Sequence, residues 1–168
     1  MRPFAIFAPL LAAAPLPALA QDVHDAYASG VAACFEEAPS VEAARACEGA
    51  AAAACMDGAE DGQTTFGMVQ CQLAERDAWD ALLNREYQDA IETFAADDAA
   101  EASADFARRE ESLRAAQRAW IAWRDAECAL MQALWGGGTM GQVDAAGCLL
   151  RLTAERTVDL RALRESQP

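Results

Sequence analysis

The sequence contains no lysine and only one histidine, His24, and these two shortages exclude several kinds of catalytic site. Without lysine there is neither a Schiff-base nucleophile nor a lysine that could hold a phosphate group. One histidine cannot build a multi-histidine metal site, and its position after the first apolar segment favours a frayed end. We therefore expect a protein that is not an enzyme and that uses no metal or cofactor.

Positive charge is also scarce. The 13 basic residues, all of them arginine, are outnumbered by 27 Asp and Glu, and the formal net charge is −14. A chain this acidic is expected to avoid nucleic acid and anionic lipid, which carry charge of the same sign. With so many acids, any carboxylate pair that resembles a glycosidase site is better interpreted as a solvated surface. The charge is compatible with a basic protein or another cationic ligand as partner.

Proline is nearly absent beyond residue 20, where Pro39 is the only one before the last residue of the chain. No stretch alternates between apolar and polar residues for long enough to indicate a strand. These features predict an all-α fold with an antiparallel three-helix core over residues 66–165. A helical hairpin that turns at Pro39 is predicted over residues 21–58, and the helical domain that follows it over residues 59–168.

No glycine or proline interrupts the chain between Met68 and Trp135, although one helix of that length would be a rod of roughly 100 Å. The chain is therefore expected to turn back within residues 95–104, and Ser103 and Asp105 suit the start of the next helix. Asp144 is expected to cap the last helix. The predicted apolar stripes are Leu73, Trp79, Leu82 or Leu83, Tyr87, Ile91 and Phe94, then Phe106, Leu113, Ala116, Trp120, Trp123, Leu130 and Leu134, then Leu149, Leu152, Leu160 and Leu163. Trp120 and Trp123 are interpreted as core residues because of their helical spacing.

The first twenty residues have the composition of an export signal. Arg2 is followed by an apolar stretch from Phe4 to Leu19, and residues 18–20 form an A-x-A cleavage site before Gln21. A membrane anchor is the alternative, but the stretch is short and contains three prolines. We predict a cleaved signal peptide over residues 1–20, a periplasmic or secreted protein, and no membrane insertion after cleavage. Loss of Arg2 leaves 12 arginines against 27 acids, a net charge of −15.

Six cysteines in an exported chain indicate oxidising surroundings and three disulfides. A zinc or haem site is not indicated, because no two cysteines have the close spacing that such sites use. Successive cysteines flank the Pro39 turn, a glycine-containing loop over residues 58–67 and a later run of three glycines. Other pairings stay open, and the predicted pairs are Cys34–Cys47, Cys55–Cys71 and Cys128–Cys148.

Several polar side chains fall beside the apolar stripes. Arg156 lies between Leu152 and Leu160 at four-residue spacing, so its guanidinium starts on the core side of the last helix. Such a charge needs a partner, and an interhelical network would satisfy it and fix the helix register. The alternative is that one of the arginines contacts a partner. The predicted network consists of Asp80, Asn84, Gln117, Arg124, Asp125 and Arg156.

The glycine run Gly136, Gly137 and Gly138 follows a helix instead of leading a strand into one, so we interpret it as a helix stop and not as a phosphate loop. Trp135 stands directly before it, away from the helical spacing of Trp120 and Trp123. A glycine loop can present backbone donors and acceptors to another molecule. Trp135 and these three glycines are therefore the candidate partner-binding residues.

Three blocks of sequence carry a family resemblance. They contain Cys71, Trp79, Asp80, Leu83, Asn84 and Tyr87, then Ala116, Gln117, Arg118, Trp120, Trp123, Arg124, Asp125 and Cys128, and, after a glycine-rich turn, Cys148, Leu152, Thr153, Arg156 and Leu160. In this order they resemble the LprI-like lysozyme-inhibitor family over about residues 55–164. The resemblance implies a small, exported, cysteine-containing helical domain, and some members of the family inhibit lysozyme. The chain departs from the family in lacking a lipoprotein cysteine and in carrying the hairpin with Cys34 and Cys47.

The resemblance and the negative charge together predict an inhibitor that occludes the cleft of c-type lysozyme, a strongly basic enzyme toward which an acidic protein is steered. The expected partner is lysozyme or another basic protein. The alternative is a structural or stress-related module of the cell envelope that binds another protein or a cationic ligand without catalysis.

Overall fold

A computed structural model describes residues 23–166 of the 168-residue chain, so the expected signal peptide over residues 1–20 lies outside the described residues. Every regular element in the described range is helical, which confirms the all-α prediction. No helix in this range is long and apolar enough to cross a membrane. The helices are α1 (Asp25–Ala28), α2 (Val31–Glu37), α3 (Val41–Arg45), α4 (Ala50–Gly58), α5 (Thr65–Ala100), α6 (Arg109–Leu134) and α7 (Met140–Glu165).

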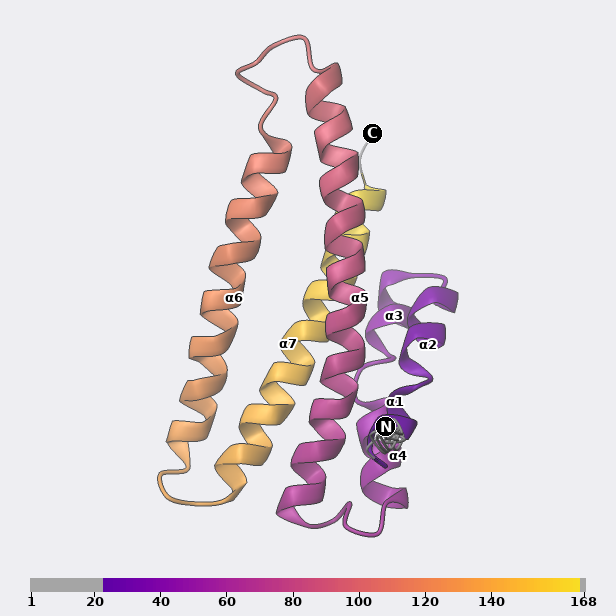
Figure 1. The fold of residues 1–168 in the computed structure, drawn as a ribbon, viewed down its shortest axis with the longest axis vertical. Coiled ribbons are helices and arrows are strands. Elements are labelled where there is room, and N and C mark those ends of the chain that lie inside the picture. The colour runs from indigo at the N-terminus through magenta and orange to yellow at the C-terminus, as the bar shows by residue number, and fades with distance from the viewer. Residues whose placement is uncertain (1–22, 167–168) are drawn as a thin grey trace, which may run out of the picture.

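The long helices α5, α6 and α7 form the predicted antiparallel core, but they are not packed equally. Helices α5 and α7 bury a series of residues against each other, whereas α6 buries only Leu113, Gln117 and Cys128. Figure 1 shows α6 leaning away from α5, with α7 crossing diagonally behind the space between them. One side of the core is therefore left thinly packed between α5 and α6.

The exposed side of α6 contradicts part of the predicted apolar stripe. Trp123 is 51% exposed and Leu134 is 71% exposed, and Phe106 and Leu130 are exposed as well. The interpretation of Trp123 as core was wrong, whereas Trp120 is half-buried. Spacing along a helix shows which residues share a face, but α6 has neighbours along only a narrow strip, so the rest of its apolar residues face solvent.

The N-terminal hairpin is built from four short helices that pack against the face of the core away from α6 (Figure 1). The first predicted helix breaks at residues 29–30, and the second breaks at residues 46–49, where Gly49 has a φ of +80°. Phe35 of α2 packs edge-on against Trp79 of α5, with ring centroids 5.6 Å apart. Since Trp79 is fully buried, this contact anchors the hairpin in the main core.

A buried carboxylate holds α4 in place. Glu75 of α5 is fully buried and accepts hydrogen bonds from the backbone N–H of Gly49 at 2.7 Å and of Ala52 at 2.6 Å, and from Trp79 Nε1 at 3.0 Å. The first N–H groups of a helix lack partners within the helix, and an anion placed there is stabilised by them. Glu75 therefore caps α4 from another helix.

The turn between α5 and α6 lies later than predicted, because α5 continues to Ala100 and α6 begins at Arg109. Asp98 is part of α5, and its carboxylate accepts from the backbone N–H of Arg109 and of Glu110 at 3.1 and 3.0 Å. Burial alone would raise the pKa of Asp98, but these backbone bonds and the Arg109 guanidinium outweigh it and hold that pKa below its ordinary value. Asp98 thus serves as the cap of α6 in place of Ser103 or Asp105.

The turn between α6 and α7 follows the predicted glycine stop, since α6 ends at Leu134 and Gly136 has a φ of +56°. Helix α7 begins at Met140, so the prediction that Asp144 caps it was wrong; Asp144 lies within α7 and accepts a hydrogen bond from Trp135 Nε1. A Cβ at Gly141 would lie 2.8 Å from the Gln132 carbonyl oxygen. Glycine at this position allows α7 to start close against the end of α6.

Three disulfides link the chain segments on either side of the Pro39 turn, the loop before α5 and the glycine turn. Cys34 bonds to Cys47, Cys55 to Cys71 and Cys128 to Cys148, which are the pairs expected from the sequence. The last pair closes a loop with a sequence separation of 20 and ties α6 to α7 beside the glycine turn. This link fixes the end of the core at which the candidate binding residues lie.

Candidate functional site

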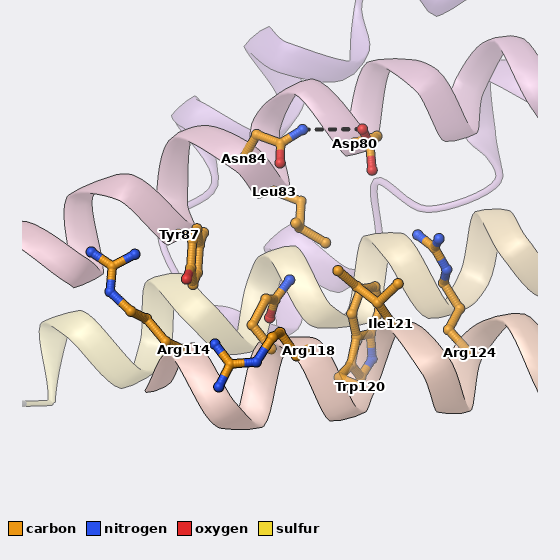
Figure 2. Close-up of a pocket in the computed structure, with 10 residues that line it drawn as sticks. Asp80, Leu83, Asn84, Tyr87, Arg114, Arg118, Trp120, Ile121 and Arg124 are labelled. Atoms are coloured by element: carbon orange, nitrogen blue, oxygen red, sulfur yellow. Dashed lines mark hydrogen bonds between the residues drawn. The ribbon is translucent and has the colours of Figure 1, made fainter. Parts of the chain in front are cut away.

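A groove opens between α5 and α6, where the core is thinly packed, and its cavity measures about 230 Å³. From α5 it is lined by Asp80, Leu83, Asn84 and Tyr87. From α6 it is lined by Arg114, Gln117, Arg118, Trp120, Ile121 and Arg124. Figure 2 shows Leu83 and Tyr87 pointing from α5 toward α6, and the Arg124 side chain reaching back toward α5.

The predicted polar network does not form as one interhelical cluster of charges. Asn84 Nδ2 donates to Asp80 Oδ2 at 3.1 Å within α5, and Arg124 pairs with its neighbour Asp125 at 2.8 Å within α6. Within the predicted set of residues, the hydrogen bond that crosses between core helices runs from Arg156 Nε to Gln117 Oε1 at 2.9 Å. The sequence spacing predicted that these side chains lie near the contact between helices. It could not show that Asp80 and Asp125 would each form a hydrogen bond with a residue of their own helix.

Two arginines flank the indole of Trp120. The guanidinium carbon of Arg124 lies 5.1 Å and that of Arg156 lies 5.9 Å from the centre of the Trp120 ring, distances typical of cation–π contacts. Burial lowers the pKa of Arg156, and Asp159 on the same helix opposes this effect. Within the described residues, no carboxylate forms an ion pair with Arg156, so the Gln117 amide and the Trp120 ring are its main compensation.

The glycine turn forms an exposed tip at one end of the core. Trp135 is 46% exposed, and Gly136, Gly137 and Gly138 are all exposed. Leu134 beside them is the most exposed large hydrophobic side chain of α6. The Cys128–Cys148 disulfide and the Trp135–Asp144 hydrogen bond hold this tip to both helices. The candidate partner-binding residues therefore lie together on a constrained, apolar protrusion, which we call the glycine tip (residues 134–138).

His24 is buried, contrary to the expectation of a frayed end. Its Nε2 lies 3.0 Å from an Asp61 carboxylate oxygen, which ties α1 to the loop before α5. Cys55 and Cys71 offer sulfur atoms within 4.8 Å of the His24 ring nitrogen, an arrangement with the ligand types of a metal site. The two sulfurs are bonded to each other, however, so they are not available as thiolate ligands.

The fold and its sites define a class, namely small, disulfide-linked, all-helical domains with an exposed tip and an open interhelical groove. The family model for lysozyme inhibitor LprI matches residues 55–160, more than half of the chain, and the chain therefore belongs to this inhibitor family. An uncharacterized protein of Rhizobium meliloti (strain 1021) is 38% identical over 98 residues, which are 57% of this chain and 70% of that relative. No solved structure matches the chain.

The matched region and the groove coincide. The range 55–160 contains α5, α6 and most of α7 but leaves out α1, α2 and α3. Of the residues that line the groove, all except Arg114 and Ile121 are among those on which the family resemblance rests. The groove was not predicted from the sequence, although both of its walls show a signal in the form of polar residues at successive turns of a helix.

Proposed function

We propose that this protein is exported and inhibits c-type lysozyme by inserting its glycine tip into the active-site cleft. The observation that carries the proposal is the match to the lysozyme inhibitor LprI family over residues 55–160. The expected signal peptide and the disulfides support an oxidising compartment outside the cytoplasm, where a lysozyme would be met.

The shape of the glycine tip supports its role as the inhibitory element. An enzyme cleft is concave, and a protruding, constrained loop with exposed apolar residues can enter it at a low entropic cost. Leu134 and Trp135 supply apolar area, and Trp is frequent among the residues that dominate binding energy. The N–H groups of Gly136 and Gly138 bond within the turn, so the Gly137 N–H and the carbonyls of Gly136 and Gly137 are the backbone groups that can meet those that normally bind the amides of a sugar chain.

Charge supports the pairing of the two proteins but does not specify the contact. The net charge of −14 attracts a basic enzyme over a distance of about 8 Å at physiological ionic strength. Attraction of this kind raises the association rate more than it lowers the dissociation rate. An inhibitory contact at the glycine tip would therefore persist in salt that slows association.

The proposal is tested by replacing Trp135 and comparing the result with a matched tryptophan elsewhere. Trp123→Ala is the control, because Trp123 is about as exposed as Trp135 but lies about three helical turns before the tip on α6. We expect Trp135→Ala to weaken inhibition of lysozyme at least about tenfold, the loss of 1.4 kcal/mol or more that is typical of a central aromatic contact. Both variants should melt close to the parent. Equal inhibition by the parent and both variants would exclude the glycine tip as the inhibitory element.

A further inference from the structure

The groove between α5 and α6 lies at the edge of their contact, where Leu83 and Gln117 are buried and most of the other lining residues are exposed or half-buried. Residues 80, 83, 84 and 87 share one face of α5, and residues 114, 117, 118, 121 and 124 share one face of α6. In a packed bundle, such facing positions interlock as apolar knobs and holes. Here, polar and charged residues occupy most of them, and a cavity of about 230 Å³ remains. The side chains at these positions therefore do not close the space between the two helices, and an open groove remains beside the core.

The lining of the groove contains more arginine than carboxylate side chains, although the chain as a whole is acidic. Arg114, Arg118 and Arg124 line the groove together with a single carboxylate, that of Asp80, although the whole chain has a net charge of −14. Arg114 is paired with Glu110 and Arg124 with Asp125, both outside the groove lining. Across the described residues, the Arg118 guanidinium has neither a hydrogen bond nor an ion pair. A guanidinium group that has no carboxylate partner is suited to binding an anion.

The Asp80 carboxylate limits which kind of anion the groove can bind. Asn84 donates to one Asp80 oxygen, which leaves the second oxygen as an acceptor in the groove wall (Figure 2). A simple anion would be repelled by this carboxylate, whereas a ligand with hydroxyl groups beside its acid can donate to it. Leu83, Tyr87 and Ile121 add apolar surface for the carbon face of a ring. The volume is below the range of about 300–1,000 Å³ that is typical of drug-sized ligands, which limits the ligand to one sugar ring.

From this combination, we propose that the α5–α6 groove binds a sugar acid, a single hydroxylated ring that carries an acidic substituent. The Arg118 guanidinium binds the acidic group. The Asp80 carboxylate, whose other oxygen is held by Asn84, accepts hydrogen bonds from the ring hydroxyls. This site is separate from the glycine tip, because Arg124 and Leu134 lie ten residues apart on α6, about 15 Å along the helix. Its lining, with three arginines and one carboxylate, also does not favour a basic enzyme as the ligand. The inference therefore does not depend on lysozyme inhibition.

Calorimetric titration of the oxidised full chain tests the proposal. The probe is N-acetylmuramic acid, and the control ligand is N-acetylglucosamine, which has the same ring with a free 3-hydroxyl in place of the lactyl ether that carries the carboxylate. We expect N-acetylmuramic acid to bind saturably and N-acetylglucosamine not to bind. Arg118→Ala should weaken the binding of the acid about tenfold or more, the effect of one charge-assisted hydrogen bond, without changing the melting temperature. Arg151→Ala removes the same charge from an exposed arginine on α7 outside the groove and should leave binding unchanged. Equal affinity for the two sugars, or an unchanged affinity in Arg118→Ala, would overturn the proposal.

Asp80→Asn separates a sugar-acid site from a general anion site. If Asp80 accepts ring hydroxyls, this variant binds N-acetylmuramic acid more weakly, although it has lost a negative charge. If the groove attracts any anion, the same variant binds more tightly, and inorganic phosphate competes as well as the sugar acid. Glucose 6-phosphate is a further probe, because it has a hydroxylated ring whose acidic group is a phosphate. If it binds as tightly as N-acetylmuramic acid, the groove does not require a carboxylate, and the assignment of its ligand as a sugar acid is overturned. Lysozyme inhibition by Arg118→Ala should equal that of the parent, which keeps this test independent of the glycine tip.

Discussion

Arg156 of α7 donates a hydrogen bond of 2.9 Å to the buried amide of Gln117 on α6, so a neutral side chain and not a carboxylate joins these two helices. Gln117 also lines the groove between α5 and α6, so the pairing lies beside that groove. Because the partner is neutral, removal of the arginine leaves no uncompensated charge behind. The cost of losing Arg156 should therefore be lower than that of breaking a buried ion pair.

Arg156→Ala should lower the free energy of unfolding by about 2 kcal/mol, the value of a hydrogen bond to a charged group plus its contact with Trp120. Arg124→Ala should cost less than about 1 kcal/mol, because its pair with Asp125 is local and Asp125 is exposed. Urea unfolding of both variants measures the two values. A larger loss for Arg124→Ala than for Arg156→Ala would contradict the assigned roles.

Glu75→Gln should lower the free energy of unfolding by about 2 kcal/mol. The amide keeps one acceptor oxygen but places an NH₂ group against one of the three donors that the carboxylate now satisfies. Glu92→Gln, on the exposed side of the same helix, makes the same chemical change and should have no measurable effect. Denaturant unfolding followed by circular dichroism compares the two variants, and equal stability in both would refute the capping role of Glu75.

The Asp98 cap predicts a pH dependence of stability. The pKa of Asp98 in the folded protein lies below its ordinary value of 3.8, so the stability that it contributes is present above that pH and is lost as the pH falls through the folded pKa. Asp98→Asn should therefore be less stable than the parent at neutral pH, and the difference should shrink below about pH 4. Thermal melts across this range, with Asp105→Asn in the adjacent loop as the control, measure the effect. A difference that stays constant with pH would show that the carboxylate charge is not involved.

Removing the Cys128–Cys148 disulfide should destabilise the protein by about 3 kcal/mol in the chain-entropy model, because the bond closes a loop with a sequence separation of 20. The double variant Cys128→Ala with Cys148→Ala should also loosen the glycine tip and raise hydrogen exchange at residues 134–140. Non-reducing peptide mapping of the parent is the accompanying check. A peptide that links Cys71 to Cys148 would contradict the pairing itself.

Much of the fold could be predicted because its signals are local. The glycine run ends α6, the shortage of proline allows long helices, and the cysteines flank the turns that they later bridge. Helix boundaries were less predictable where a side chain from another element sets them. Asp98 caps the helix that follows its own, so the Asp97-Asp98 pair, which suggested a helix end, lies inside α5.

The sites depended more on tertiary structure. Glu75 lies four residues before the buried Trp79, on the core face of α5, and this placement of an acid on an apolar stripe was the signal that could have identified it. The groove could not be predicted, because its existence depends on how far α6 leans away from α5. Residues at successive helical turns, such as Arg114 and Arg118, indicate a shared face but not what that face meets.

The central claim is most directly tested by titrating c-type lysozyme activity with the purified, oxidised protein at about 0.15 M salt, where long-range attraction is largely screened. Occlusion of the cleft predicts saturable inhibition that is complete near a one-to-one ratio and that Trp135→Ala weakens. Lysozyme activity that stays unchanged at a large excess of the protein would contradict the account and favour a cell-envelope module with a different partner.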